Sequence, residues 1–152
     1  RFVFLANKYR NIFRNNFLNN AQIPLEDSKI FFSNLDKDNS RILYGISYNE
    51  EWIGHFGLKL LGNKDIMLDN AIRFSAKGGK KLFRDINLEL IKQVKINLVD
   101  YDIFIIIKKG NTTALNLHIG LGFTDCNKDY YDMYSIDAKG YSLMKINRVS
   151  VI

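Results

Sequence analysis

The stretch RFSAKGGKKLFRDINLELI, residues 73–91, contains the strand, glycine loop and helix pattern that is most informative about the fold. It passes from a strand-like run, through a loop with two glycines, into a segment whose apolar residues recur at helical spacing. The first amides of a helix lack intrahelical partners and carry partial positive charge. Glycine lets a ligand approach the backbone, and Lys77, Lys80 and Lys81 add full charges. The segment is either a solvated helix start or a site for an anion.

Before this stretch, the sequence predicts a meander of three antiparallel strands. The strands are expected, with tight turns between them, at residues 41–49, 52–61 and 66–74. Strict alternation along the second strand places His55 on the same side as Ile53, opposite Trp52 and Phe56.

Helices flank the meander, and a further strand and helix follow the opening stretch. We expect a helix through Tyr9, a helix over 23–35 that starts near Pro24, a helix over 80–96, a buried strand at 103–107, a helix over 111–121 and a final strand at 141–152. This order predicts an α+β fold, with a mixed central sheet and helices on both faces, in a single domain of residues 1–152.

The composition limits the classes of partner. The chain has 22 Lys and Arg against 16 Asp and Glu, a net charge of +6, which favours anionic partners. Basic residues cluster at one helix start instead of along an exposed recognition helix, so we expect no nucleic acid partner. The longest wholly apolar run, residues 103–107, is too short to cross a bilayer, so we expect no membrane partner.

The cysteine count and the N-terminus indicate a cytoplasmic protein. The single Cys126 excludes an intramolecular disulfide and is compatible with a reducing cytosol. With one cysteine and two histidines, a structural zinc site is not expected. The N-terminal residues lack the pattern of a signal peptide, and the absence of an initiator Met leaves open whether residues precede Arg1 in the natural protein.

Two motifs together resemble the GNAT superfamily of acyl-CoA-dependent N-acyltransferases. The first has the form [RQ]-x-x-G-x-[GA] in that family, and Arg73, Ala76 and Gly78 follow it, with Ala76 in place of the first glycine. Alanine is acceptable there provided that its backbone does not need a positive φ. The element order also resembles the family over about residues 1–148, without the family's first strand.

The second motif is N-x-x-A-x-x-x-Y-x-x-x-G-F, within KKGNTTALNLHIGLGF at residues 108–123. Asn111, Ala114 and the final Gly-Phe pair match in spacing, and His118 stands at the tyrosine position. Asn111 is also suited to cap the helix that follows it.

The resemblance implies acetyl-CoA as co-substrate, held between the strands at 66–74 and 103–107, with no metal. It implies a pyrophosphate bound by the backbone amides of the glycine loop, and a pantetheine arm paired with the edge of the 66–74 strand. The cofactor-binding positions that follow are Ile72, Arg73, Phe74, Ala76, Lys77, Gly78, Gly79, Lys80, Lys81, Asn111, Ala114 and His118.

Three residues are candidates for moving protons. An alkylammonium has a pKa of ~10.4, so it must lose a proton before it attacks a thioester. Asp69 or His55 is the candidate base, although Asp69 could be a solvated or turn-bonding residue and His55 a structural one. In the family the motif tyrosine often protonates the leaving thiolate, so His118 is the candidate acid. The alternative is that His118 only packs there while water supplies the proton.

The N-terminal segment Tyr9-Arg10-Asn11 and the residues after it resemble one GNAT branch. That branch includes N-acetyltransferases of nucleotide-linked amino sugars, on routes to surface glycans and nonulosonic acids, and of ribosomal-protein α-amines. The sugar group is the closer of the two, with a protein or peptide α-amine acetyltransferase and a non-catalytic acyl-CoA-binding domain as alternatives. The sequence leaves the oligomeric state open, with a homodimer as one alternative. The acceptor-binding candidates are Arg10, Asn11, Phe17, Tyr44 and His55.

Overall fold

The computed structural model describes residues 1–146. Its elements, in chain order, are α1 (Phe2–Ile12), the 3-10 turn η1 (Arg14–Asn16), α2 (Leu25–Ser33), the 3-10 turn η2 (Leu35–Lys37), β1 (Arg41–Tyr48), β2 (Glu51–Gly62), β3 (Asp65–Arg73), α3 (Gly79–Asn97), β4 (Asp102–Lys108), α4 (Thr112–Gly120), β5 (Thr124–Asp125), α5 (Lys128–Met133) and β6 (Tyr141–Ile146). The helices and strands expected between residues 23 and 121 are present, with ends within two residues of those predicted. The final strand is confirmed over Tyr141–Ile146, and the remainder of its expected range, 147–152, lies outside the described residues.

The sheet is mixed, as the sequence predicted. Its strand order is β1-β2-β3-β4-β6-β5, and every neighbouring pair is antiparallel except β3 and β4. That parallel pair is short, since Asp65–Leu68 lie opposite Asp102–Ile105 and no pairing continues beyond them. The remainder of β3 and of β4 therefore separate, which leaves two unpaired strand edges facing each other.

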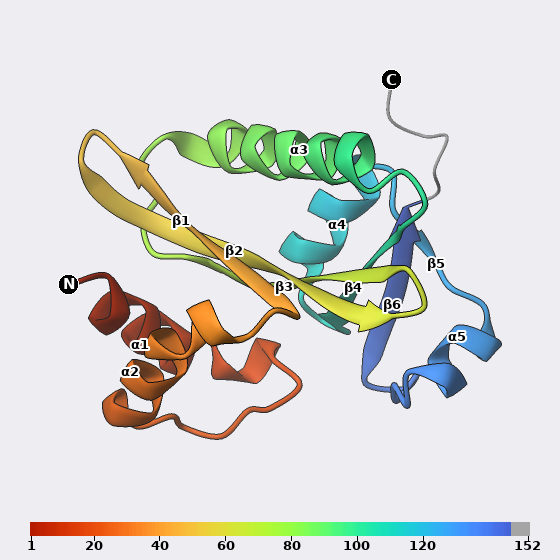
Figure 1. Ribbon diagram of the computed structural model, residues 1–152, viewed down its shortest axis with the longest axis horizontal. Helices are drawn as coiled ribbons and strands as arrows, with labels where there is room; N and C mark the ends of the chain where they lie inside the picture. Colours follow the sequence, from red (N-terminus) through yellow and green to blue (C-terminus); the bar gives the residue numbers. More distant parts are fainter. Residues whose placement is uncertain (147–152) are drawn as a thin grey trace.

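Helices cover both faces of the sheet (Figure 1). On one face, α3 and α4 pack on a core that includes Ile66, Ile103 and Ile105. On the other face, α1 packs on Ile72, and α5 packs on Phe104 through Tyr131. Together with the sheet they make a three-layer arrangement.

The expected alternation along β2 is wrong because β2 carries a bulge. The register with β1 shifts between Ile46 and Ser47, so an extra β2 residue is inserted there. As a result Ile53 and Phe56 share one cluster beneath α3, whereas Trp52 and His55 both contact Phe2 of α1. The bulge thus places Trp52, and not Ile53, on the same face as His55, toward the N-terminal helices.

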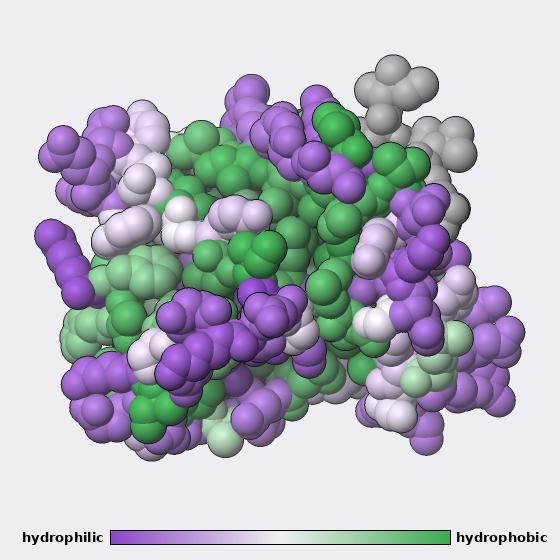
Figure 2. Space-filling view, in the orientation of Figure 1, coloured by the Kyte–Doolittle hydropathy of each residue, from purple (hydrophilic) through white to green (hydrophobic). Residues whose placement is uncertain are grey.

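Hydrophilic and hydrophobic side chains separate clearly on the surface shown in Figure 2. Hydrophilic residues gather over the outer side of α3, while hydrophobic surface lies between α3 and the N-terminal helices, where β1 forms the edge of the sheet. The exposed apolar residues there include Ile42 and Tyr44 of β1.

Candidate active site

A cavity of about 870 Å³ opens where β3 and β4 separate. It extends from the strand edges to α1, α2 and the segment between them on one side, and to α4 on the other. A pocket of this size, with polar groups converging on apolar walls, is the usual form of a small-molecule site.

The floor of the cavity contains a second bulge, at Asn70 of β3. His55 lies opposite Ile72 and Gly57 lies opposite Asp69, so β3 has one residue more than β2 over this interval. Asn70 adopts a left-handed conformation with φ 52°, which asparagine tolerates better than most residues. Because the bulge lies just beyond the last β3–β4 pair, it re-aims backbone groups of β3 at the point where the strands separate.

Asp69 is held beside this bulge by two partners. The Nε of Arg41 lies 3.1 Å from its Oδ2, and Asn70 donates a side-chain hydrogen bond of 3.0 Å to the same oxygen. Both contacts use Oδ2, so Oδ1 remains available to accept from a ligand. All three residues line the cavity.

His55 reaches the cavity from β2 but is only 3% exposed. Its ring lies within 6.2 Å, centroid to centroid, of Phe2, Phe32 and Phe74. Burial in this aromatic cage lowers the pKa of His55 to about 4, although a contact with the backbone of Asn70 opposes the shift. His55 is therefore neutral at physiological pH, and its Nδ1 is buried with no partner among the described residues.

His118 reaches the same cavity from α4 and is only 4% exposed. Its Nδ1 lies 2.8 Å from the carbonyl oxygen of Ala114, one helical turn earlier, and its ring packs edge-on against Phe123. Burial lowers the pKa of His118 below its ordinary value. Within the described chain, its Nε2 is buried without a partner.

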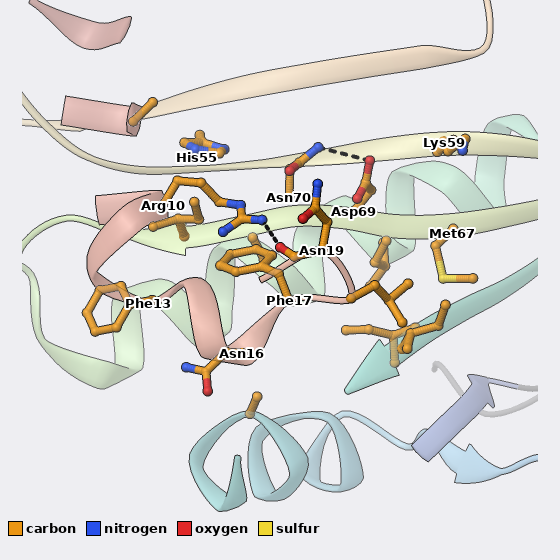
Figure 3. A pocket seen from close by; sticks show the side chains of 18 of the residues that line it. Arg10, Phe13, Asn16, Phe17, Asn19, His55, Lys59, Met67, Asp69 and Asn70 are labelled. Carbon is orange, nitrogen blue, oxygen red and sulfur yellow. Dashed lines mark hydrogen bonds between the residues drawn. The ribbon is translucent and has the colours of Figure 1, made fainter. Parts of the chain in front are cut away.

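The N-terminal segment contributes a guanidinium to the wall of the cavity (Figure 3). Arg10 lies 4.1 Å from the centroid of the Phe17 ring, and its Nη2 donates to the carbonyl of Asn19. Its Nη1 is buried with no partner in residues 1–146. Figure 3 shows Arg10 and Asn19 in the same part of the cavity as Asn70 and Asp69 of β3.

Arg73 donates hydrogen bonds to the backbone of the glycine loop between β3 and α3. Its Nε donates to the carbonyl of Ser75 at 2.7 Å, and its Nη2 donates to the carbonyls of Ala76 and Gly79 at 2.8 and 3.0 Å. These three hydrogen bonds tie the loop carbonyls to one guanidinium. Ala76 has no positive φ. It therefore meets the condition under which alanine can replace the first glycine of the motif.

Gly78 is one of two neighbouring positions in the loop where a positive φ favours glycine, the other being Gly79 with φ 72°. The φ of Gly78 is 75°, and a Cβ there would lie 2.2 Å from a methyl group of Leu82. Gly78 is the N-cap residue of α3, and no side chain caps this helix end. The first amides of α3 are consequently without a side-chain acceptor.

The charges around this helix start are the reverse of those that stabilise an isolated helix. The first turn of α3 contains no acidic residue, and Lys80 and Lys81 lie there instead. Lys77 pairs with Glu51 at 2.5 Å, and Lys81 pairs with Asp85. Lys80 is exposed and has no ion pair within the part of the chain that the structure describes.

The buried polar atoms without partners belong to residues around one cavity. Within residues 1–146, the buried side-chain nitrogens that lack a hydrogen bond are Arg10 Nη1, Arg41 Nε, His55 Nδ1 and His118 Nε2. Arg41 Nε has only its ion-pair contact with Asp69. Each of the four residues lines the cavity. Because an unpaired buried polar group is costly, their concentration here indicates a site for a polar ligand.

The structure brings together most, but not all, of the residues singled out from the sequence. Those that line the cavity are Arg10, Phe17, His55, Asp69, Ile72, Arg73, Asn111, Ala114 and His118. The glycine-loop residues Ala76, Lys77, Gly78, Gly79, Lys80 and Lys81 lie outside it, at the start of α3. Asn111 caps α4 as expected, accepting from the Ala114 amide at 3.2 Å.

Three predicted site residues lie elsewhere. Asn11 does not line the cavity, and its side chain exchanges hydrogen bonds of 2.8 and 2.9 Å with the backbone of Ile23. Tyr44 packs near Phe56 on the α3 face of the sheet. Phe74 is buried in the aromatic cluster around His55 and is not among the lining residues.

Several polar residues that line the cavity were not predicted from the sequence; among them are Arg41, Lys59, Asn70 and Tyr141. Asparagine in a strand is a signal for a left-handed residue, so Asn70 could have been found. The others could not, because their positions depend on strand register. The Tyr141 hydroxyl lies 3.5 Å from the carbonyl of Phe17, so β6 approaches the N-terminal segment across the cavity.

Cysteine and metal chemistry find no support among the described residues. Cys126 lies outside the cavity, and burial raises the pKa of its thiol to about 11. In residues 1–146, no group of three or more His, Cys, Asp or Glu side chains is arranged to hold a metal. Within the same range, no helix has the length and apolarity needed to span a membrane.

No family model and no curated protein matches the sequence of this chain. Several solved structures, however, resemble its fold. The N-acetyltransferase PseH of Campylobacter jejuni with acetyl coenzyme A is 18% identical, covers 80% of this chain and 78% of its own, and has a TM-score of 0.63. The ribosomal-protein-alanine N-acetyltransferase of Brucella melitensis is 18% identical. The match covers 94% of this chain and 92% of that protein, with a TM-score of 0.70. The spermidine N-acetyltransferase of Vibrio cholerae, in complex with CoA and spermine, is 13% identical. The match covers 95% of this chain and 88% of that protein, with a TM-score of 0.76.

These similarities confirm the expected fold. The mixed sheet with one splayed parallel pair and helices on both faces is the GNAT N-acyltransferase fold. At 13–18% identity the likeness concerns the fold, and the ligands of this chain are a separate question.

Proposed function

We propose that the protein is an acetyl-CoA-dependent N-acetyltransferase that transfers an acetyl group to a primary amine in a ternary complex. The observation that carries the proposal is the cavity between the splayed strands, where buried nitrogens of Arg10, His55 and His118 have no partner among the described residues. The fold is that of known N-acetyltransferases, including ones with acetyl-CoA or CoA bound.

Acetyl-CoA enters, in this proposal, from the side of α3 and α4. Its pyrophosphate binds the uncapped amides at the start of α3, where Lys80 supplies a charge with no ion pair among the described residues. Its pantetheine arm lies in the gap beyond Leu68 and Ile105, where the free edges of β3 and β4 can bond its amides. The position of the lysines at an uncapped helix end supports this placement.

The acceptor amine approaches from the opposite face, through the part of the cavity lined by Arg10, Asp69 and His55. The amine nitrogen attacks the thioester carbon, an N–C bond forms, the C–S bond breaks, and the thiolate leaves. We assign Asp69 as the group that takes the amine proton, directly or through water, because its Oδ1 is uncommitted. His55 is less suited to this role, since its ring is only 3% exposed and is enclosed by Phe2, Phe32 and Phe74.

For the acceptor, we propose a nucleotide-linked amino sugar. The charged side chains that line the cavity are four cations, Arg10, Arg41, Lys59 and Arg73, against two anions, Asp27 and Asp69. A polyphosphate-bearing acceptor complements such a lining, whereas a polyamine does not. The asparagines and phenylalanines of the N-terminal segment, Asn16, Asn19, Phe13 and Phe17, offer amides for hydroxyl groups and rings for stacking.

A protein or peptide α-amine is the second candidate acceptor. It is favoured by the open mouth formed by exposed loop residues such as Asn16 and Leu18, which an extended chain could enter. A non-catalytic acyl-CoA-binding domain would use the same cofactor side without Asp69. We also propose a cytoplasmic location, on the ground of the single Cys126.

The test is a two-stage measurement. Thermal stabilisation by acetyl-CoA is measured first, and release of CoA thiol is then followed with amino sugars linked to nucleoside diphosphates, N-terminal peptides and spermidine. Turnover with the sugar nucleotides alone supports the proposal in full. Turnover with peptides alone replaces the acceptor, and binding without any turnover indicates a non-catalytic domain.

A further inference from the structure

His118 has one ring nitrogen fixed as a donor and the other left free as an acceptor. Its Nδ1 lies 2.8 Å from the carbonyl oxygen of Ala114, and a carbonyl can only accept, so Nδ1 carries the proton. In the neutral ring Nε2 then bears a lone pair. That lone pair is buried and has no partner in the described part of the chain. A ligand that satisfies it must therefore offer a hydrogen.

The position of His118 places this lone pair at the deep end of the cofactor side of the cavity. The chain reverses after β4, and α4 runs back beside it (Figure 1). Asn111 lies at the start of α4, and His118 is seven residues further, roughly 10 Å along the helix axis. The same direction leads to the point where β3 and β4 rejoin, at Leu68 and Ile105.

A cofactor bound as proposed would bring its sulfur to this end. With its phosphates at the start of α3 and its arm in the gap, the last atoms of the arm would reach the region where the strands rejoin. His118 also lies on the α3 and α4 face, because its ring packs against Phe123 of the core cluster beneath those helices. The acceptor residues Arg10 and Asp69 lie on the other face of the sheet.

We propose that His118 accepts a hydrogen bond from the S–H group of product CoA and does not protonate the departing thiolate. The inference rests on the proposed function. The proton balance is complete without a histidine acid, because the neutral amine and acetyl-CoA give the amide and CoA thiol, and the proton lost by the amine is returned to the sulfur through water. A thiolate beside the lone pair of Nε2 is disfavoured, so the site holds CoA as the thiol. The thiol is the weaker nucleophile, which opposes the reverse transfer.

The test compares the dissociation constants of CoA, acetyl-CoA and desulfo-CoA by calorimetry, in the wild type and in His118→Phe. The wild type is expected to bind CoA roughly fivefold more tightly than desulfo-CoA, the effect of one hydrogen bond to a buried acceptor. In His118→Phe this preference disappears while the affinity for acetyl-CoA, which has no S–H, is retained. Ile119→Phe, at a 53% exposed position on the same helix, is the matched control and keeps the preference.

His118→Gln keeps the test valid should the phenylalanine variant not fold, because the glutamine oxygen can accept the same bond and should retain part of the preference. Equal losses for CoA and acetyl-CoA in His118→Phe would show that Nε2 accepts from an amide of the arm, and would overturn the proposal. An unchanged preference in that variant would also overturn it. If the wild type binds neither CoA nor acetyl-CoA, the proposed function itself is contradicted.

Discussion

Arg41 and Asp69 form an ion pair of 3.1 Å that joins β1 to β3 across the intervening β2. Both side chains are largely shielded from solvent and both line the cavity. Because Asn70 bonds to the same carboxylate oxygen, the pair also fixes the bulge beside it. The arrangement leaves Oδ1 of Asp69 uncommitted on the side of the splayed strands where we propose that the acceptor binds.

Asp69→Asn is expected to lower kcat by about 10²–10⁴, the range associated with loss of a general base. The affinity for acetyl-CoA should be unchanged, because Asp69 lies on the acceptor side of the cavity. Steady-state kinetics and calorimetry separate the two effects. Asp36→Asn, at an exposed position in η2, is the control and should behave as wild type. A wild-type kcat in Asp69→Asn would remove the carboxylate from the mechanism.

Arg10→Met is expected to raise the KM for a phosphate-bearing acceptor by about 10- to 100-fold. The estimate corresponds to one hydrogen bond to a charged group, ~1.5–3 kcal/mol. The KM for acetyl-CoA should not change. Arg14→Met tests the same substitution at an exposed position of η1, outside the cavity lining, and should have little effect. If both variants raise the acceptor KM equally, only the overall charge of the segment matters.

Lys80→Glu is expected to weaken acetyl-CoA binding by roughly three- to tenfold, about 1 kcal/mol, because it replaces an exposed cation beside the helix end. Lys92→Glu makes the same charge change at an exposed position further along α3 and should have a smaller effect. Calorimetry at two salt concentrations measures both. Identical losses in the two variants would show that the start of α3 is not the phosphate site.

Two glycine-loop variants test the backbone itself. Ala76→Gly should bind acetyl-CoA no worse than the wild type, since Ala76 does not use a positive φ. Gly78→Asp should lose binding, because the new side chain adds negative charge, clashes with Leu82 and strains the backbone. Circular dichroism checks that the variant remains folded. Normal binding by folded Gly78→Asp would exclude this loop as the cradle.

His55 is expected to make stability depend on pH. Its pKa is about 4 in the folded chain and ~6.5 when unfolded, so between these values the unfolded state binds more protons. The contribution of neutral His55 to the free energy of unfolding is therefore fully present above about pH 6.5. It is lost as the pH is lowered toward 4, which reduces the free energy of unfolding by on the order of 3 kcal/mol. Urea unfolding at several pH values measures this, and His55→Phe, which suits the aromatic cage, should show a smaller slope. An equal slope in the variant would contradict the assignment.

The order of elements could be predicted because local patterns determine it. The helical spacing after Lys80 and the wholly apolar run at 103–107 describe one segment each, and the structure places α3 and β4 there. The short β5 and α5 were not predicted, since neither is long enough to show a period. Tertiary packing stabilises them, as when Tyr131 bonds to the amide of Leu143.

The site was harder to predict because it depends on two bulges. Alternation fails at Ile53, so the face reached by His55 could not be deduced from spacing. Arg41 and Asp69 are 28 positions apart and meet only through the register of three strands. Likewise, the motif predicted where His118 would lie, whereas which of its nitrogens carries the proton follows from the carbonyl of Ala114.

The brevity of the β3–β4 pairing has a mechanical consequence. Only Asp65–Leu68 and Asp102–Ile105 join the first three strands to the last three, so the sheet is two halves connected by a short seam. A cofactor whose amides bond to both free edges would extend that seam and act as a missing strand. We therefore expect amide exchange in β3 and β4 beyond Leu68 and Ile105 to slow when acetyl-CoA binds, as the two halves become one continuous sheet.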